Sequence, residues 1–312
     1  MKLILGFSIP LLFGNLFQQF YSMVDTMIVG RVLGTGPLAA VGSTGSITFL
    51  IIGFCLGLCS GFAIPVAQRF GSRDYKELRR FIGNAVWLCV GFGIVLTVLT
   101  VIFCRNILEL MGTPADIIDD AYAYLVVIFA GIPATFLYNM LAGIQRAIGD
   151  SRMPLYVLIV CCLANVVLDL LFVVVFHWGV FGVAFATILS QLISAVLLMI
   201  RLMGTQEAYR VELRKIRFHK DILKNVVRIG LPAGLQSVMY SFSNILIQAS
   251  INSFGTTAIA AWAAIGKIDG FIWMVMNAFG IAVTTFAGQN FGARQYDLSL
   301  IHISEPTRHA QI

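Results

Sequence analysis

Long runs of apolar residues, separated by short polar stretches, dominate this chain. Most runs are about 20 residues or longer, which is the length a helix needs to cross about 30 Å of hydrocarbon. The pattern therefore predicts an all-α transmembrane protein with eight spanning helices. We place the helices at residues 7–30, 38–66, 82–104, 119–143, 155–176, 180–203, 226–253 and 257–288.

The composition agrees with this pattern, because 59% of the residues are hydrophobic and only 12% are charged. A soluble domain carries about 25% charged residues. The first apolar run is too long for a signal peptide and contains Asp25, so we interpret it as a spanning helix.

The lysines and arginines gather in alternate loops, after the second, fourth and sixth helices. They are Arg69, Arg73, Lys76, Arg79 and Arg80; Arg146 and Arg152; and Arg201 with the basic residues of 204–224. The positive-inside rule then predicts a cytoplasmic N-terminus and a basic cytoplasmic linker at 204–224. The net charge of +6 lies where topology requires it, so we expect no nucleic-acid partner.

The chain lacks the sequence patterns of a metal centre or an enzyme. The six cysteines lie in or at the ends of apolar runs and have no zinc-ligand spacing with the histidines, which is typical of small buried side chains. No phosphate-binding loop or catalytic triad pattern occurs. We therefore expect neither an enzyme nor a cofactor beyond a transported ion. Gly53, Gly57 and Gly61 recur every fourth residue, a pattern typical of close helix contacts.

The chain matches itself at an offset of 221 residues. The matching pairs include Gln68 with Gln289, Phe70 with Phe291, Gly71 with Gly292, Arg73 with Arg294, and Tyr75 with Tyr296. The first two predicted helices thus recur as the seventh and eighth. Because six helices separate the copies, the repeat is parallel, and two parallel six-helix halves are typical of secondary transporters.

The repeat also predicts that the native protein continues beyond this chain. We assign residues 1–203 to a complete N-lobe and 225–297 to the start of a C-lobe whose last four helices are missing. The run LSLIHISEPTR at 298–308 resembles the translation of a sequencing adapter. We therefore expect 298–312 to be a non-native tail, the alternative being a genuine short tail.

Two aspartates, Asp25 and Asp169, lie inside apolar runs, where a carboxylate costs about 2.5–3.5 kcal/mol on insertion scales. Tyr21 with Asp25, and Asn165 with Asp169, are four residues apart, so each pair shares a helix face. Their carboxylate, amide and hydroxyl oxygens suit a hard cation, and two nearby carboxylates can also share a proton. The alternative is that each aspartate only pairs with polar neighbours across a helix interface.

Several motifs in this order and spacing resemble the multidrug and toxic compound extrusion (MATE) family. They are IPLLFGNLFQQFYSMVDTMIVGRVLG at 9–34, VAQRFGSRDY at 66–75, LAGIQRAIGDSRMP at 141–154, ANVVLDLLFVVVFHWGVFGVAFATILSQ at 164–191, LPAGLQSVMYSFSN at 231–244 and TTFAGQNFGA at 284–293. The resemblance covers residues 1–297.

This resemblance implies two six-helix lobes around a central cavity, and export of drugs and organic cations in exchange for Na⁺ or H⁺. It implies a cation site at Tyr21, Asp25, Asn165, Asp169 and Thr187. Pro10 matches a proline implicated in bending of the first helix. We further expect a monomer in a bacterial inner membrane.

In the second half, the candidate cavity residues are Lys267, Asp269, Asn244 and Gln248. Lys267 and Asp269 are two residues apart and so point to different sides of a helix. The alternatives to a cavity role are that Lys267 snorkels to the membrane interface or that these residues pair with a missing helix. The seventh helix lacks the carboxylate that some family members carry there, which puts a second cation site in doubt. Trp262, Phe271 and Trp273 lie nearby, and we expect them to be lipid-facing or interfacial aromatics. The alternative is that they stack on a cationic aromatic drug.

Two other functions remain as alternatives. One is a lipid-linked oligosaccharide flippase of the same superfamily, which would need a large cationic cavity. The other is a non-transporting membrane scaffold or a membrane-embedded enzyme. The few cations predicted at membrane depth count against the flippase, and the missing catalytic pattern counts against the enzyme.

Overall fold

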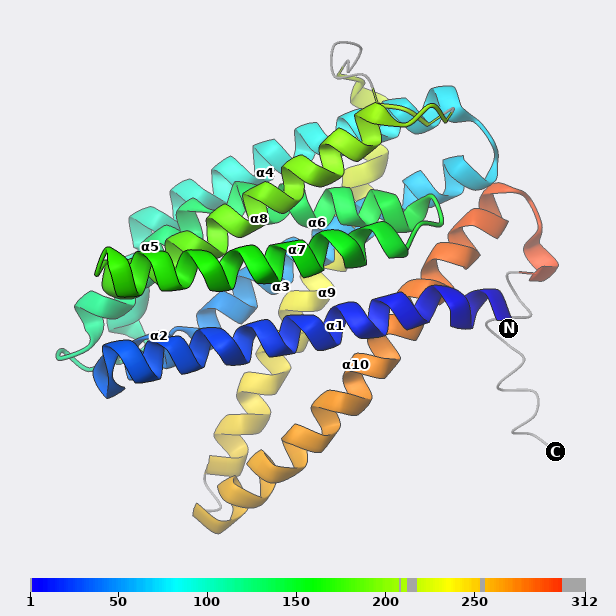
Figure 1. Cartoon of the computed structure of the whole chain (residues 1–312). Helices are drawn as coiled ribbons and strands as arrows, with labels where there is room; N and C mark the ends of the chain where they lie inside the picture. Colours follow the sequence, from blue (N-terminus) through cyan, green and yellow to red (C-terminus); the bar gives the residue numbers. More distant parts are fainter. Residues whose placement is uncertain (1, 208, 212–217, 253–255, 299–312) are drawn as a thin grey trace.

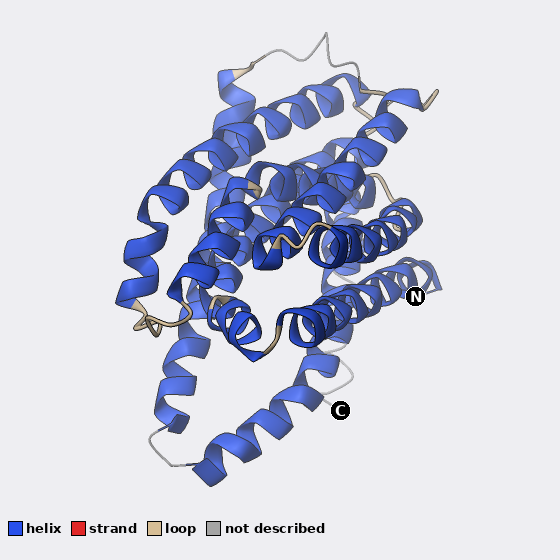
Figure 2. Ribbon diagram, turned by 60° about the vertical axis from the view of Figure 1, so that its left-hand side comes forward, coloured by secondary structure: helices blue, strands red, loops and turns tan. Residues whose placement is uncertain are grey.

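The structure of this 312-residue chain is a computed structural model that describes residues 2–207, 209–211, 218–252 and 256–298. These residues form helices joined by loops (Figures 1 and 2). The elements are α1 (Lys2–Ile28), η1 (Val29–Leu33), α2 (Thr35–Ser43), α3 (Gly45–Gly71), α4 (Tyr75–Leu110), α5 (Ile118–Ala130), α6 (Ile132–Ala147), α7 (Arg152–Asp169), η2 (Leu170–Val175), α8 (Gly179–Gly204), α9 (Lys220–Asn252) and α10 (Thr256–Gly292). The predicted tail at 299–312 lies outside the described residues.

The predicted all-helical transmembrane class is confirmed. Among the described residues, six helices are long and apolar enough to span a membrane, or seven if the bent pair α5–α6 counts as one span. The predicted seventh span corresponds to α9, a helix of 33 residues, which is not among these candidate spans. Its glutamine, serine and asparagine residues make it less apolar than the other spans.

The predicted second helix at 38–66 is wrong in one respect, because a break at Thr44 divides it into α2 and α3. The side chains of Ser43 and Thr44 donate hydrogen bonds to the carbonyls of Ala40 and Val41, both at 2.7 Å. Such local bonds from side chain to backbone compete with continuation of a helix.

The predicted fourth helix at 119–143 is bent by 47° where α5 meets α6 at Gly131. Pro133 has no N–H to donate to the carbonyl of Phe129, and its ring clashes with that carbonyl in a straight helix. Thr97 of α4 donates to the Phe129 carbonyl instead, at 3.0 Å. A Cβ on Gly131 would lie 2.0 Å from Ile188 Cδ1, so only glycine lets α8 approach the bend this closely.

The core lies where α3, α4, α5, α6 and α8 meet. Phe62, Phe129 and Phe136 are among its fully buried side chains. By contrast, Ile102 and Trp87 on α4 are more than half exposed. Exposed apolar side chains on the outside of the bundle are expected where lipid, rather than water, is the solvent.

The two repeats meet through small residues of α3 and α9. A Cβ on Gly57 would lie 2.5 Å from Ser237 Oγ, and a Cβ on Gly61 would lie 2.5 Å from Gly230 Cα. The close helix contact expected from the glycine spacing is therefore confirmed, because these backbones approach to a distance that excludes larger side chains.

The backbone carries the repeat that the sequence predicts. Arg73 and Arg294, 221 residues apart, both have left-handed backbone conformations, with φ of 57° and 59°. After each helix, equivalent hydrogen bonds close the last turn: Arg73 N to Phe70 O and Arg294 N to Phe291 O. The packing repeats as well, because α3 contacts α9 while α10 contacts α1 (Figure 1).

The glycine contact between the repeats gives a stability prediction. Gly61→Ala places its methyl group against the backbone of Gly230, which cannot rotate away, and should lower the free energy of unfolding by about 1–3 kcal/mol. The measurement is thermal unfolding in detergent, followed with a thiol-reactive dye that detects exposure of the buried cysteines.

Gly91→Ala on α4 is the matched control, because nothing lies within 4 Å of its Cβ position. It should leave the unfolding temperature unchanged or raise it slightly, since alanine favours helix more than glycine does. Equal unfolding temperatures for Gly61→Ala and the wild type would contradict the proposed backbone contact.

Candidate functional site

The five residues predicted to bind a cation converge between α1, α7 and α8. Tyr21 and Asp25 come from α1, Asn165 and Asp169 from α7, and Thr187 from α8. Tyr21 Oη donates a hydrogen bond of 3.3 Å to Thr187 Oγ1, which in turn donates to the carbonyl of Val183 at 3.0 Å. Asn165 and Asp169 are completely buried. The structure therefore brings all five predicted residues to one place.

The carboxyl groups of Asp25 and Asp169 are direct electrostatic neighbours across the interface between α1 and α7. Tyr124 on α5 interacts electrostatically with both of them. Sequence reasoning missed Tyr124, because a single tyrosine in an apolar run has no distinctive spacing. Only the packing of α5 against α8 places its phenol beside the carboxylates.

Five buried polar atoms at this site have no hydrogen-bond partner among the described residues. They are Asp25 Oδ1, both carboxylate oxygens of Asp169, and the amide oxygen and nitrogen of Asn165. Leaving a buried polar group unsatisfied costs about 1–3 kcal/mol, and more for a charged group. Four of these atoms are oxygens, the ligands that a hard cation prefers, and a proton could also bind between the carboxylates. The donor set therefore fits Na⁺ or H⁺.

Both helices that carry the aspartates end in a wider, π-helical turn. η1 begins four residues after Asp25, and η2 begins immediately after Asp169. Val29 of η1 and Val173 of η2 pack together against Val183 of α8. Short π-helical segments occur frequently at functional sites. Here the two turns hold the carboxylate-bearing ends of α1 and α7 against the same helix.

The opposite face of α1 lines a different space, a cavity of about 720 Å³ between α1 and α10. The lining residues are Leu16, Gln19, Phe20, Ser22, Met23, Thr26 and Met27 of α1, with Gly266, Gly270, Phe271 and Met274 of α10. A mainly apolar wall with a few polar groups is typical of a small-molecule site, and methionine adapts to varied shapes. One helix therefore separates the carboxylates from a cavity large enough for a drug-sized molecule.

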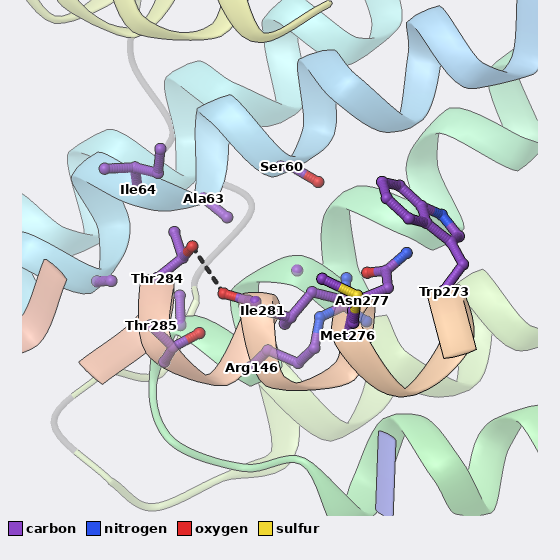
Figure 3. A pocket seen from close by; sticks show the side chains of 14 residues that line it. Ser60, Ala63, Ile64, Arg146, Trp273, Met276, Asn277, Ile281, Thr284 and Thr285 are labelled. Carbon is purple, nitrogen blue, oxygen red and sulfur yellow. Dashed lines mark hydrogen bonds between the residues drawn. The ribbon is translucent and has the colours of Figure 1, made fainter. Parts of the chain in front are cut away.

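A second cavity, of about 420 Å³, lies between α3, α6 and α10 (Figure 3). Arg146 lines it, although the sequence had placed Arg146 in the loop after the fourth helix. That assignment is wrong, because α6 extends through Arg146 to Ala147.

The structure does not bring the candidate residues of the second half to the carboxylate site. Asn244 and Gln248 on α9 and Asp269 on α10 are exposed. Lys267 lies on α10, but its side chain is outside the described residues. A role for these four residues in a C-lobe cavity stays a prediction.

Pro10 lies inside α1, and the helix continues through it. A proline at this position cannot donate to the carbonyl of Gly6, so this turn lacks one backbone hydrogen bond. This is a weak point in the helix that carries Asp25. Bending at Pro10 stays a prediction.

Comparison with known proteins shows to which family this chain belongs. The MatE family model matches residues 10–171 and 232–299. The probable multidrug resistance protein YoeA of Bacillus subtilis (strain 168) is 33% identical over 298 residues, which are 93% of this chain and 64% of YoeA. YpnP, a probable multidrug resistance protein of the same organism, is 30% identical, over 94% of this chain and 65% of YpnP. The chain thus spans less than two thirds of these curated relatives.

Solved structures show the same fold. A MOP superfamily transporter from Pyrococcus furiosus gives a TM-score of 0.88 at 25% identity, covering 96% of this chain and 67% of that chain. Crystal structures of MATE in bent and straight conformations give TM-scores of 0.88 and 0.86, both at 25% identity and over 96% of this chain and 68% of theirs. Together with the family match in both repeats, these similarities identify a multi-pass membrane protein that belongs to the MatE family of multidrug and toxic compound extrusion transporters.

Proposed function

We propose that the protein exports small amphipathic or cationic molecules by alternating access, in exchange for Na⁺ or H⁺. The observation that carries this proposal is the adjacent pair Asp25 and Asp169, because three of their carboxylate oxygens are buried without a hydrogen-bond partner among the described residues. A cation or a proton bound there removes the cost of an unneutralised carboxylate in hydrocarbon. Tyr21, Asn165 and Thr187 supply the remaining polar groups.

The position of α1 offers a physical route for coupling. Asp25 lies on the face of α1 that packs against α7, whereas Ser22, Met23 and Thr26 line the large cavity on another face. Neutralising the carboxylates changes the packing of α1, and a helix already weakened at Pro10 can bend in response. The cavity face then moves with the cation face, so occupancy of one site changes the shape of the other.

The contact between the repeats supports a closed cytoplasmic side in this conformation. A Cβ on Gly71 would lie 1.9 Å from Gln289 O, and a Cβ on Gly292 would lie 1.8 Å from Gln68 O. Gln289 Nε2 also donates a hydrogen bond of 2.7 Å to the carbonyl of Ala147 at the end of α6. The large cavity lies between α1 and α10, toward the N-terminal end of α10. That end of α10 diverges from the bundle (Figure 1). Opening toward the cytoplasm therefore requires these C-terminal ends to separate.

The partners and location follow from the same proposal. The methionine and phenylalanine side chains of the large cavity favour amphipathic substrates of varied shape. The clusters of lysine and arginine favour a cytoplasmic N-terminus, and the Bacillus subtilis relatives favour a bacterial plasma membrane. We propose that the transporter acts as a monomer. A lipid-linked oligosaccharide flippase stays the alternative, because the lining of the 720 Å³ cavity includes no lysine or arginine among the described residues, whereas Arg146 lines the second cavity.

The first test concerns Asp25. Asp25→Asn removes the charge that must be neutralised and should slow Na⁺-driven or proton-driven efflux from proteoliposomes at least about tenfold, within the range of typical coupling energies. Asp74→Asn, at the N-cap of α4, makes the same charge change far from the site and keeps a side chain that can accept from Glu77 N. It should leave efflux unchanged. Wild-type efflux by Asp25→Asn under both gradients would contradict the proposal.

The second test uses stability rather than transport. Asp169→Asn should raise the unfolding temperature in Na⁺-free buffer at neutral pH, because it removes an unneutralised buried carboxylate at a cost of about 1–3 kcal/mol. The wild type should gain stability when Na⁺ is added or the pH is lowered, since a ligand that binds only the folded state stabilises it. The variant should lose that response.

Asp150→Asn is the control for this experiment, because its side chain accepts bonds from the Arg152 and Met153 amides and an asparagine can do the same. It should respond to Na⁺ and pH as the wild type does. A less stable Asp169→Asn variant with an intact response to both ions would show that the carboxylate has only a structural role.

The third test concerns the contact between α3 and α10. Gly292→Ala puts a methyl group against the carbonyl of Gln68 and should shift the population toward the state that is open to the cytoplasm. With the native cysteines replaced, Thr284→Cys in the cavity beside this contact should then react faster with an impermeant maleimide in inside-out vesicles. Gly204→Ala, at the end of α8 with nothing within 4 Å, should not change the rate. Equal rates for Gly292→Ala and Gly204→Ala would argue against this contact as the closure.

A further inference from the structure

Arg146 points into the protein although it lies in the last turn of α6. Its Nη2 atom would be 3.8 Å from a Cβ built on Gly143, one turn earlier in the helix. The side chain therefore runs back along α6, in the direction that helical Cα–Cβ bonds favour. A long cationic side chain near the end of a spanning helix usually reaches toward the aqueous interface instead. The guanidinium of Arg146 lines the 420 Å³ cavity between α3, α6 and α10 (Figure 3).

No acidic side chain among the described residues neutralises this guanidinium. The ion pairs found there involve Arg80 and Arg105, and the Arg146 side chain makes neither an ion pair nor a hydrogen bond with the described part of the chain. Its electrostatic neighbours are the phenol of Tyr138 and the thiol of Cys59, which are neutral at physiological pH in their ordinary state. A cation within a spanning segment normally pairs with a counter-charge or marks a substrate pathway.

The other residues that line the cavity between α3, α6 and α10 indicate what kind of anion fits it. Trp273 lines the cavity, and its ring is stacked on Tyr240 with centroids 5.2 Å apart and planes 10° apart. Asn277, next to Trp273, and Thr284, at the opposite end of the lining, add polar groups (Figure 3). A guanidinium can hold a carboxylate through two parallel hydrogen bonds, while a fixed indole ring contacts a flat apolar body.

We propose that this cavity, which we call the Arg146 cavity, binds aromatic substrates whose only charge is a carboxylate. Arg146 holds the carboxylate, and Trp273 and Met276 contact the apolar body. The inference rests on the proposed export function and names a substrate class for it. The Arg146 cavity is lined by α3, α6 and α10, and thus differs from the carboxylate pair on α1 and α7, which carries the opposite charge.

Two matched probes test this site by binding alone, so the result does not depend on cation-coupled transport. They are 2-naphthoate and a naphthalene of the same size carrying a trimethylammonium group, measured by equilibrium dialysis against the purified protein. Arg146→Gln should weaken 2-naphthoate binding at least about tenfold, because it removes the cationic partner of the carboxylate. It should leave binding of the ammonium probe within about twofold. Arg146→Lys should give an intermediate loss, because an ammonium cannot form the two parallel bonds.

A second variant keeps Arg146 and fills the site from within. Asn277→Asp adds a carboxylate of nearly the same shape to the cavity, where it should occupy the guanidinium and weaken 2-naphthoate binding while sparing the ammonium probe. Arg152→Gln, at the start of α7 and outside the cavity lining, is the matched control and should bind both probes as the wild type does.

The outcomes separate the two proposals. Wild-type 2-naphthoate affinity in both Arg146→Gln and Asn277→Asp, or an equal loss of both probes in these variants, would overturn the Arg146 cavity as an anion site. Failure of the wild type to bind 2-naphthoate would overturn it as well. Selective loss of 2-naphthoate binding would support the site even if Asp25→Asn were to transport normally, in which case only the cation coupling fails.

Discussion

Two carboxyl groups between α1 and α7, with no neutralising partner among the described residues, impose the constraint on which the rest of the site depends. Asp169 is fully buried and Asp25 is partly buried. In hydrocarbon such a pair is costly, so the fold must either protonate it or surround it with cation ligands. Both helices change to a π-helical turn near their aspartate, and Tyr21 and Thr187 bond to each other beside the pair. These polar groups of the N-lobe thus gather around the Asp25 and Asp169 carboxylates.

The same constraint gives α1 its two roles. One face of the helix meets the carboxylate of Asp169, and another face forms the wall of a 720 Å³ cavity against α10. Any movement of α1 that accompanies neutralisation of the carboxylates therefore changes the shape of the cavity. At the opposite end of the molecule, the mutual contact of Gly71 with Gln289 and of Gly292 with Gln68 holds the two repeats together. The shape of the cavity and the closure at the Gly71 and Gly292 contacts then both depend on the position of α10.

Much of this arrangement follows from local sequence rules. The four-residue spacing of Tyr21 with Asp25 and of Asn165 with Asp169 fixes their shared helix faces, and the offset of 221 residues predicts the equivalent ends of α3 and α10. What sequence could not supply were contacts made by tertiary packing. Tyr124 joins the carboxylates only because α5 packs against α8.

Arg146 is a second residue whose environment the sequence did not predict. Its place after an apolar run is typical of a cytoplasmic loop charge, yet α6 continues through it and its side chain turns back into a cavity. The 47° bend at Gly131, by contrast, has a sequence signal in Pro133, but the length of the apolar run concealed it. Helix ends and bends depend on caps and neighbours more than on hydropathy.

The central claim is that Asp25 and Asp169 hold the coupling cation. It is tested most directly by measuring ²²Na⁺ binding and proton uptake by the purified protein, comparing the wild type with the double variant Asp25→Asn and Asp169→Asn. The account predicts that the wild type binds Na⁺ or takes up a proton near neutral pH and that the double variant does neither. Equal Na⁺ binding and equal proton uptake by both proteins would contradict it.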